Sequence, residues 1–180
     1  LFISLDSCIA QNVEGEINLG RKAIFNFTKS EYKAATQSWD IAEDKRGLLY
    51  FANNDGLLEY NGRDWQLYKV DNQTIVRSVA IDDQGRIFTG AQNELGWFDS
   101  DENGKLQYHS LKKFLPSTLS LEDVWDIVIT GGKVYFRTNR YVLCFDGEQK
   151  IDVIYKGSTL FLGKARGKLY LQKQDFGLLQ

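Results

Sequence analysis

The chain has 180 residues, of which 43% are hydrophobic and 13% aromatic, a composition that excludes a disordered segment and predicts a packed fold. Its 22 basic and 24 acidic side chains give a formal net charge of -2, and no block of basic residues occurs along it. Direct nucleic-acid binding relies on such blocks to neutralise phosphates and is therefore not expected. No run of about 18 apolar residues occurs either, so the sequence predicts no membrane-spanning helix.

The first ten residues resemble the end of a secretory signal. Small side chains at Cys8 and Ala10 occupy positions minus three and minus one of a cleavage before Gln11. Two other interpretations stay open, because Leu5 to Cys8 loosely resembles a lipoprotein box and a first apolar strand would have a similar composition. The sequence contains no methionine, so we expect the gene product to begin upstream of residue 1.

Four short apolar segments, separated by turn residues, recur along the chain with a period of roughly 40 residues. The first copy begins at Trp39-Asp-Ile, the third begins at Val124-Trp-Asp-Ile, and Gly47 and Gly62 mark the hairpins of the first copy. Within each copy β-branched and aromatic residues alternate with polar ones, which predicts strands. The turn glycines follow Asp, Asn, Gln or Arg, as hairpins with positive φ angles require.

The repeats divide the chain into a lead-in and four blades. The lead-in, expected to be a strand, covers residues 11–36, and the blades cover residues 37–72, 75–114, 121–157 and, in part, 159–180. Four strands in roughly 40 residues are typical of a propeller blade. The sequence therefore predicts an all-β propeller, present as an incomplete ring of about three and a half blades that continues past residue 180. An open β-solenoid is the main alternative, although its coils are normally shorter than these units.

The first repeat carries a resemblance to a known family. Trp39-Asp-Ile and the run Gly-Leu-Leu-Tyr-Phe-Ala-Asn-Asn-Asp-Gly-Leu-Leu-Glu-Tyr-Asn-Gly-Arg-Asp-Trp over residues 47–65 resemble the two-component-regulator propeller repeat. Residues 25–37, 75–80 and 94–98 are similar to N-terminal portions of sensor regulators from Bacteroidetes-type bacteria, so the resemblance covers about residues 20–157. The chain departs from the family at Lys22-Ala, where a proline is common, and in its degraded fourth unit.

The resemblance implies a periplasmic, extracytoplasmic propeller whose parent protein is anchored in the membrane through a segment outside this chain. In that family the propeller is often followed by a small β-sandwich and signals to a cytoplasmic output, which is a histidine kinase, a helix-turn-helix DNA-binding domain or a phosphatase. We expect the remaining blades and the output domain as partners in the same chain, and a homodimeric parent protein. No output module lies in these 180 residues, so the resemblance implies no enzyme here.

The best candidate site lies where the channel of a propeller opens. The innermost strands line the channel, and their starts meet the turns after the second strands at one mouth. Amides, arginines, a carboxylate and tryptophan faces suit a neutral or anionic oligosaccharide or another envelope ligand, because aromatic faces stack on sugar rings and amides bridge hydroxyls. The candidate ligand-binding residues are Gln37, Trp39, Asn53, Asn54, Arg77, Gln92, Asn93, Glu94, Trp125, Asn139 and Arg140.

A purely structural interpretation competes with this site. Tryptophans at repeated positions commonly pack between blades, and the run Asn53-Asn-Asp-Gly commonly forms a plain turn. Arg77 would then pair with a neighbouring carboxylate such as Asp82 and meet no ligand.

Other chemistry-bearing residues are weaker candidates. Asp99-Ser-Asp-Glu-Asn-Gly matches the opening of a calcium loop, but its twelfth position is Ser110 in place of the bidentate glutamate, so we expect a polar hairpin. His109 has no partner in Ser-His-Asp order and no second metal ligand beside it. Cys8 and Cys144 lie in unrelated contexts, which predicts neither a zinc site nor a disulfide framework. We therefore expect no metal and no cofactor.

Three functions fit these observations. The first is a ligand-sensing module whose cue shifts the arrangement of a dimeric receptor, which requires unequal affinity for two arrangements. The second is a propeller hydrolase or lyase acting on polysaccharide. Adjacent carboxylates such as Asp82-Asp83 and Glu122-Asp123 point apart on a strand, but two from different blades would be able to meet in the channel. The third is a protein-binding scaffold. A polar aromatic pocket would favour the sensor. A carboxylate pair at the mouth would favour the enzyme, and a flat apolar face would favour the scaffold.

Overall fold

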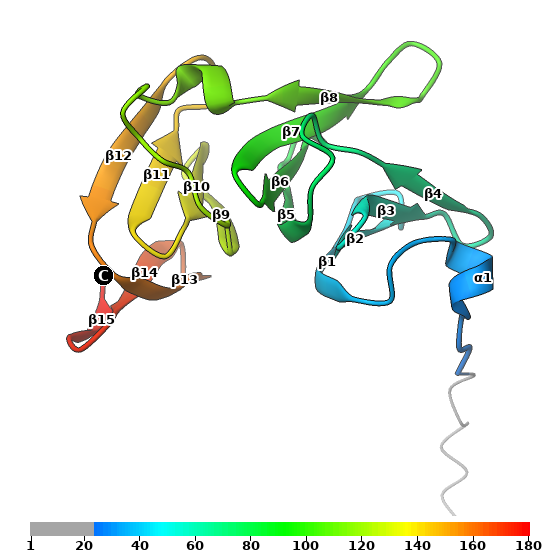
Figure 1. The fold of residues 1–180 in the computed structure, drawn as a ribbon, viewed down its shortest axis with the longest axis horizontal. Coiled ribbons are helices and arrows are strands. Elements are labelled where there is room, and N and C mark those ends of the chain that lie inside the picture. The colour runs from blue at the N-terminus through cyan, green and yellow to red at the C-terminus, as the bar shows by residue number, and fades with distance from the viewer. Residues whose placement is uncertain (1–23) are drawn as a thin grey trace, which may run out of the picture.

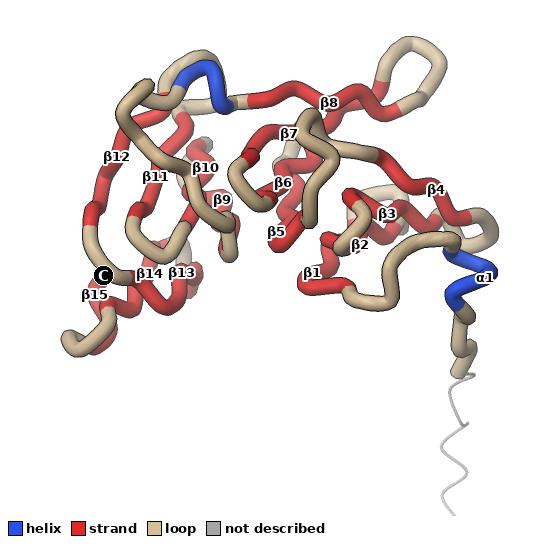
Figure 2. Tube along the Cα trace, viewed as in Figure 1, coloured by secondary structure: helices blue, strands red, loops and turns tan. Residues whose placement is uncertain are grey.

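The chain forms four antiparallel sheets joined by turns and loops, seen in a computed structural model that describes residues 24–180 (Figure 1). The signal remnant expected at residues 1–10 lies outside the described part, as do residues 11–23 of the lead-in. Strands and the loops between them make up almost all of the described chain, with two short helical turns (Figure 2). None of the helices in residues 24–180 is long and apolar enough to cross a membrane.

Each sheet is a meander in which the order of the strands follows the sequence. The first sheet contains β1 (Ser38–Glu43), β2 (Leu49–Asn53), β3 (Gly56–Tyr60) and β4 (Trp65–Tyr68). The second contains β5 (Val76–Ile81), β6 (Ile87–Ala91), β7 (Glu94–Ser100) and β8 (Leu106–Ser110). The third contains β9 (Asp126–Thr130), β10 (Lys133–Arg137), β11 (Tyr141–Phe145) and β12 (Ile151–Lys156). The fourth has three strands, β13 (Thr159–Ala165), β14 (Lys168–Lys173) and β15 (Gly177–Leu179).

The sheets follow one another along an arc, with their first strands on its concave side (Figure 1). β1 contacts β5, β5 contacts β9, and β9 contacts β13, so these four strands are the innermost ones. The last strands β4, β8 and β12 lie on the convex side. This is the blade arrangement of a propeller, and the predicted all-β propeller of four-stranded blades is confirmed.

The lead-in differs from the expectation in its described part. Residues 24–36 contain no strand and instead form one helical turn, α1 (Lys29–Tyr32). The reason is a capping box, in which the backbone N–H of Thr28 donates to the Glu31 carboxylate at 2.5 Å. The Thr28 hydroxyl donates to the same carboxylate at 2.7 Å. Local capping thus outweighs the strand propensity of the preceding aromatic residues. A 3₁₀ turn, η1 (Lys112–Phe114), lies between the second and third sheets.

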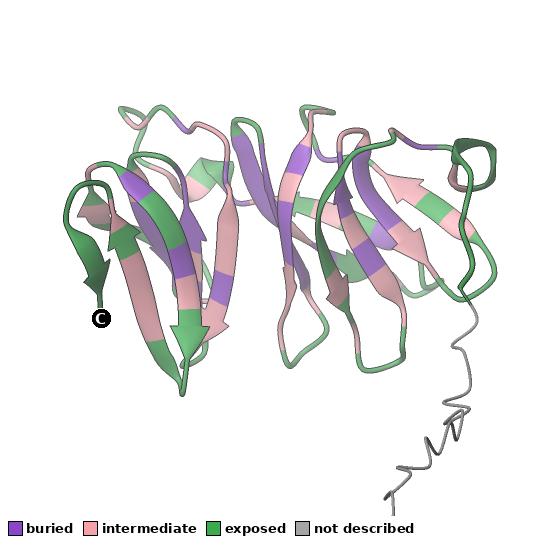
Figure 3. Cartoon of the chain, turned by 90° about the horizontal axis from the view of Figure 1, so that it is seen from below, coloured by how far each residue is buried: buried purple, intermediate pink, exposed green. Residues whose placement is uncertain are grey.

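The hydrophobic core lies between successive sheets (Figure 3). All five residues of β6 are buried, because this strand is covered on both faces. Phe88 of β6 packs with Phe136 and Phe145 of the third sheet, at ring-centroid distances of 6.3 Å. At Gly90 the sheets approach so closely that a Cβ atom would lie 2.5 Å from Val124 Cγ1. A blade of this kind is therefore stabilised mainly by its neighbours.

Side-chain hydrogen bonds link the innermost strands and explain the repeated Trp-Asp-Ile motif. The Asp40 carboxylate accepts the backbone N–H of Val79 at 3.0 Å, and the Asp126 carboxylate accepts that of Leu162 at 2.8 Å. Between them, the Ser78 hydroxyl donates to the Val124 carbonyl at 2.9 Å. Each contact joins one blade to the next, so the motif fixes the spacing of the strands that line the channel.

The two end sheets expose apolar side chains. Ile41 of the first sheet is 54% exposed, while Phe161 and Leu178 of the fourth are 48% and 61% exposed. In the middle sheets the equivalent faces are covered by neighbours, so these end faces are the ones on which a further blade would pack.

Candidate functional site at the channel mouth

Three successive blades place one side chain each at the start of the innermost strand. The register of β1 shifts between Ser38 and Asp40, and that of β5 shifts between Val76 and Ser78, so Trp39 and Arg77 lie outside the ladders. Trp125 directly precedes β9, where its backbone N–H donates to the Arg137 carbonyl at 2.8 Å. Such irregularities re-aim side chains, and here they direct three of them toward one another.

Together with Asp123 these side chains form what we call the channel-mouth cluster: Trp39, Arg77, Asp123 and Trp125. The guanidinium carbon of Arg77 lies 4.2 Å from the ring centroid of Trp39 and 4.8 Å from that of Trp125. The two indole rings are 5.9 Å apart in an edge-to-face arrangement. Arg77 Nε donates to the Asp123 carboxylate at 3.1 Å. One planar cation therefore joins two aromatic faces and a carboxylate from different blades.

The open surface of the cluster belongs to Trp39. The side chains of Arg77 and Asp123 are only 11% and 17% exposed, whereas Trp39 is 41% exposed. The indole N–H of Trp39 donates to Asn54 Oδ1 at 2.7 Å, which fixes the orientation of the ring. The indole N–H of Trp125 is buried and has no hydrogen-bond partner among residues 24–180. The cluster thus presents one oriented aromatic face to solvent.

A polar depression of about 500 Å³ shares Asp123 with the cluster, and we call it the polar hollow. Its floor and walls come from the turns after β6 and β10 and from the segment before β9. Within it the Arg140 guanidinium lies 3.1 Å from the Glu122 carboxylate, and the backbone N–H of Asn93 donates to the Glu122 carbonyl at 3.2 Å. The lining residues are Gln92, Asn93, Leu121, Glu122, Asp123, Asn139 and Arg140.

The eleven sequence-derived candidates divide into three groups. Trp39, Asn54, Arg77 and Trp125 form or adjoin the cluster, and Gln92, Asn93, Asn139 and Arg140 line the hollow. The third group comprises Gln37, Asn53 and Glu94.

The members of the third group have structural contacts. The Gln37 carbonyl accepts the backbone N–H of Asn54 at 3.1 Å. Asn53 is 1% exposed, and its amide donates to the Ala35 carbonyl at 2.8 Å. Glu94 is 3% exposed, and its carboxylate accepts the Ser110 hydroxyl at 2.8 Å. The expectation that Asn53 and Glu94 face the mouth is therefore wrong, because Asn53 turns inward to the lead-in and Glu94 turns inward to its own blade.

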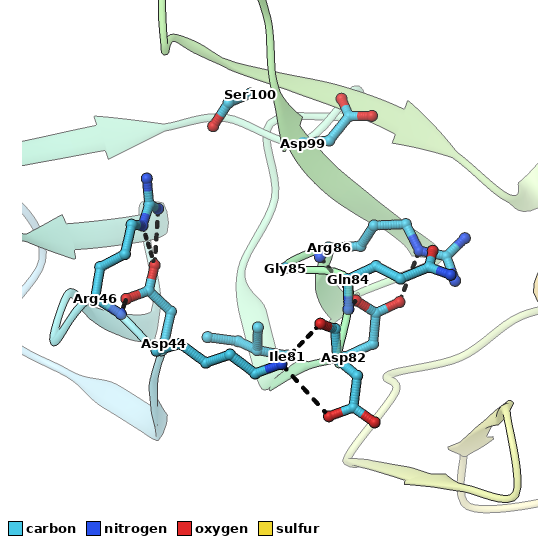
Figure 4. A pocket seen from close by; sticks show the side chains of 11 residues that line it. Asp44, Arg46, Ile81, Asp82, Gln84, Gly85, Arg86, Asp99 and Ser100 are labelled. Carbon is cyan, nitrogen blue, oxygen red and sulfur yellow. Dashed lines mark hydrogen bonds and ion pairs between the residues drawn. The ribbon is translucent and has the colours of Figure 1, made fainter.

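Arg77 does have a carboxylate partner, but a different one from the neighbour suggested by the sequence. Asp82 pairs with Arg86 at 2.7 Å (Figure 4). Asp82 follows the end of β5, whereas Arg77 lies near the start of that strand. There Asp82 shares a depression of about 430 Å³ with Asp44, which pairs with Arg46 at 2.7 Å. Figure 4 shows both arginines beside their own aspartates. Two ion pairs of this second depression, Asp44 with Arg46 and Asp82 with Arg86, each lie within one turn and brace it. A third pair joins two blades, because Lys45 Nζ lies 3.8 Å from the Asp83 carboxylate.

Two residues that sequence reasoning did not place in the site are Glu122 and Asp123. Their side chains diverge, as adjacent residues of an extended segment do, so that one meets Arg140 and the other Arg77. The available signal was the spacing Asp123-Val-Trp125, which repeats the spacing Gln37-Ser-Trp39 at the start of the first blade.

The weaker candidates have ordinary roles. The Asp101 carboxylate of the calcium-like loop accepts the backbone N–H groups of Asn103 and Lys105, both at 2.9 Å, as in a polar hairpin. No group of three or more possible metal ligands occurs among residues 24–180. His109 Nε2 lies 2.7 Å from an Asp99 oxygen on the exposed side of β8. Cys144 is buried in β11, and burial raises the pKa of its thiol.

No family model matches the chain, and no curated protein does. Among solved structures, the chain is similar to the extracellular domain of a protein described as a hybrid two-component system from B. thetaiotaomicron, with 18% identity and a TM-score of 0.62 over 86% of this chain and 22% of that one. A second such domain from the same organism matches with 18% identity and a TM-score of 0.62 over 81% and 20% of the two chains. A protein described as a gluconolactonase matches with 14% identity and a TM-score of 0.54 over 77% and 56%.

These likenesses show the propeller fold. The chain spans about a fifth of the length of the two-component extracellular domains. The propeller fold that the resemblance in the first repeat implies is also the fold of these structural neighbours.

Proposed function

We propose that this chain is part of the extracytoplasmic sensing region of a membrane-anchored bacterial signal-transduction regulator, and that its channel mouth binds a carbohydrate or another envelope ligand. The observation that carries the proposal is that the channel-mouth cluster, with its exposed Trp39, shares Asp123 with the polar hollow. An aromatic face beside amides and hydrogen-bonding charges is the usual composition of a sugar site. The extracellular location of the two-component structural neighbours supports the sensor class.

The charges at the mouth favour binding over catalysis. Glu122 and Asp123 each lie 3.1 Å from an arginine nitrogen, so both carboxylates already have a charged partner. A hydrolase or lyase of the general acid type needs a carboxyl group that is within reach of the bond to be broken. Glu122 is directed to Arg140 and Asp123 to Arg77, so the polysaccharide-degrading alternative loses its best candidates.

A ligand bound at the channel mouth would affect the relative positions of three blades. Trp39, Arg77 and Trp125 belong to successive blades and are held in one cluster. A ligand that stacks on Trp39 and bonds to the hollow therefore stabilises one relative arrangement of those blades. Signalling follows when that arrangement differs in affinity from the unliganded one and is passed to the membrane-anchored remainder of a homodimeric parent protein.

The test is thermal-shift and calorimetric screening of the full chain against neutral and anionic oligosaccharides and cell-wall fragments. We expect a stabilising compound whose affinity falls about 3- to 10-fold in Trp39→Ala, the amount that one aromatic contact contributes. Trp97→Ala is the matched control, because Trp97 is a half-buried indole of the same chain that stacks on His109 away from the mouth. Equal losses in both variants, or no binding by any compound to a cooperatively folded protein, would favour a scaffold that binds only protein.

A further inference from the structure

The charged groups of the polar hollow are paired with one another. Glu122 and Arg140 form one pair across it, and Asp123 forms the other with Arg77, whose guanidinium is covered by the two indoles. Lys112 does not line the hollow, and its ammonium group donates to the Asn93 carbonyl at 3.0 Å. Arg140 is therefore the guanidinium that faces the hollow, and its Nε lies beside the Glu122 carboxylate.

An anionic ligand would meet an unfavourable arrangement here. A sulfate or carboxylate group is normally held by an arginine or lysine that offers free N–H donors. An anion that bonds to Arg140 lies close to Glu122 and Asp123, which carry the same sign of charge. This repulsion costs affinity, and the cost grows as water is excluded from the hollow.

A neutral polyol would meet a favourable arrangement of charged groups in the hollow. A hydroxyl group donates one hydrogen bond and accepts others, so it can donate to the Glu122 carboxylate and accept from the Arg140 guanidinium without separating them. The amides of Gln92 and Asn139, which also line the hollow, add further donors and acceptors. The intact pair is thus a ready hydrogen-bonding site for uncharged sugars.

We propose that Glu122 is a specificity-determining residue, which neutralises Arg140 and so makes the hollow select uncharged over anionic glycans. The inference rests on the proposed function for the ligand class, but the role of Glu122 toward anions is open to test without any sugar. Glu122 is only 29% exposed while Arg140 is 71% exposed, so removing the carboxylate charge leaves an accessible guanidinium without the negative charge that offsets it.

The first arm uses inorganic sulfate as the probe. Melting of the full chain is compared in sodium sulfate and in sodium chloride of equal ionic strength, for the wild type, Glu122→Gln, and Glu122→Gln combined with Arg140→Gln. We expect a saturable sulfate-specific stabilisation in Glu122→Gln alone, with the wild type and the double variant responding as in chloride. Glu148→Gln, which neutralises an exposed carboxylate on the β11–β12 turn, is the matched control. A wild type that binds sulfate as well as Glu122→Gln does would overturn the proposal.

The second arm uses a glycan in charged and uncharged forms, such as tetragalacturonate and its methyl ester, together with neutral gluco- and xylo-oligosaccharides. We expect the wild type to bind uncharged forms at least about tenfold more tightly, and Glu122→Gln to shift the ratio toward the anion by about tenfold, as the loss of one charge-assisted hydrogen bond predicts. A wild type that prefers the anionic form contradicts the inference while leaving a sugar sensor in place. Binding by none of the glycans contradicts the sugar class, and the sulfate arm then decides the role of Glu122.

Discussion

The aspartates of the two Trp-Asp-Ile motifs give a matched pair for measuring what holds the blades together. Asp40 and Asp126 occupy the same position in the first and third blades, and each accepts a backbone N–H from the innermost strand of the next blade. Asp126 makes a second interaction, because its carboxylate also forms an ion pair with Arg137. Substitution of each by alanine should therefore destabilise the chain by different amounts.

The magnitudes follow from the groups left without partners. Loss of a hydrogen bond to a charged acceptor costs about 1.5–3 kcal/mol, and Asp40→Ala should lie at the lower end because Asp40 is an exposed residue. Asp126→Ala also leaves the guanidinium of Arg137, whose side chain is 7% exposed, without its counter-ion. Breaking a buried pair from one side costs about 3–5 kcal/mol, so we expect a loss of about 4 kcal/mol for Asp126→Ala against about 1.5 kcal/mol for Asp40→Ala.

The assay is urea unfolding followed by far-UV circular dichroism, with thermal melting as a second measure. For a chain of this size the two losses correspond to falls in Tm of roughly 12 °C and 5 °C. The double variant Asp126→Ala, Arg137→Met should recover much of the loss, because it removes the uncompensated charge. Equal losses in the two alanine variants, or no recovery in the double variant, would refute the assignment of Arg137 as the source of the difference.

Three further predictions concern the cluster, acid stability and the end faces. The losses of unfolding free energy caused by Arg77→Met and Asp123→Ala should be non-additive in a double-mutant cycle, with a coupling of about 2 kcal/mol measured by urea unfolding. Additive losses would mean that the interaction between the two side chains does not stabilise the fold. Burial acts to raise the pKa of Asp44, but hydrogen bonds from the Arg46 side chain and from backbone N–H groups outweigh it and bring the pKa below its usual 3.8. The stability contributed by this carboxylate is therefore present above about pH 4 and is lost as the pH falls through the lowered pKa of the folded protein. Asp44→Asn should therefore make the free energy of unfolding depend less steeply on pH in this acid range. A pH dependence as steep as that of the wild type would contradict the assignment. We expect the exposed apolar face of the fourth sheet to cause self-association of the chain. The double substitution Phe161→Ser, Leu178→Ser should therefore reduce self-association measured by light scattering. Unchanged self-association would mean that another surface causes it.

The fold was accessible from the sequence because its signals are local and repeated. Alternating apolar residues predict strands, glycines after polar residues predict hairpins, and the repetition of Trp-Asp-Ile gives the period of the blades. The lead-in is the exception among the described elements. There the pair Thr28 and Glu31 caps a helical turn in place of the expected strand.

The site was accessible only in part. The sequence indicates that Trp39, Arg77 and Trp125 lie at the starts of innermost strands, because each has the same position in its repeat. It does not indicate that the partner of Arg77 is Asp123, which lies 46 residues away in the next blade. Likewise, nothing in the alternation of residues shows that Asn53 and Glu94 turn inward, since this depends on which backbone and hydroxyl groups of the folded blade need a partner. Strands and blades therefore follow from local periodicity, whereas charge pairing and side-chain direction at the mouth depend on how neighbouring blades pack, which only the tertiary structure decides.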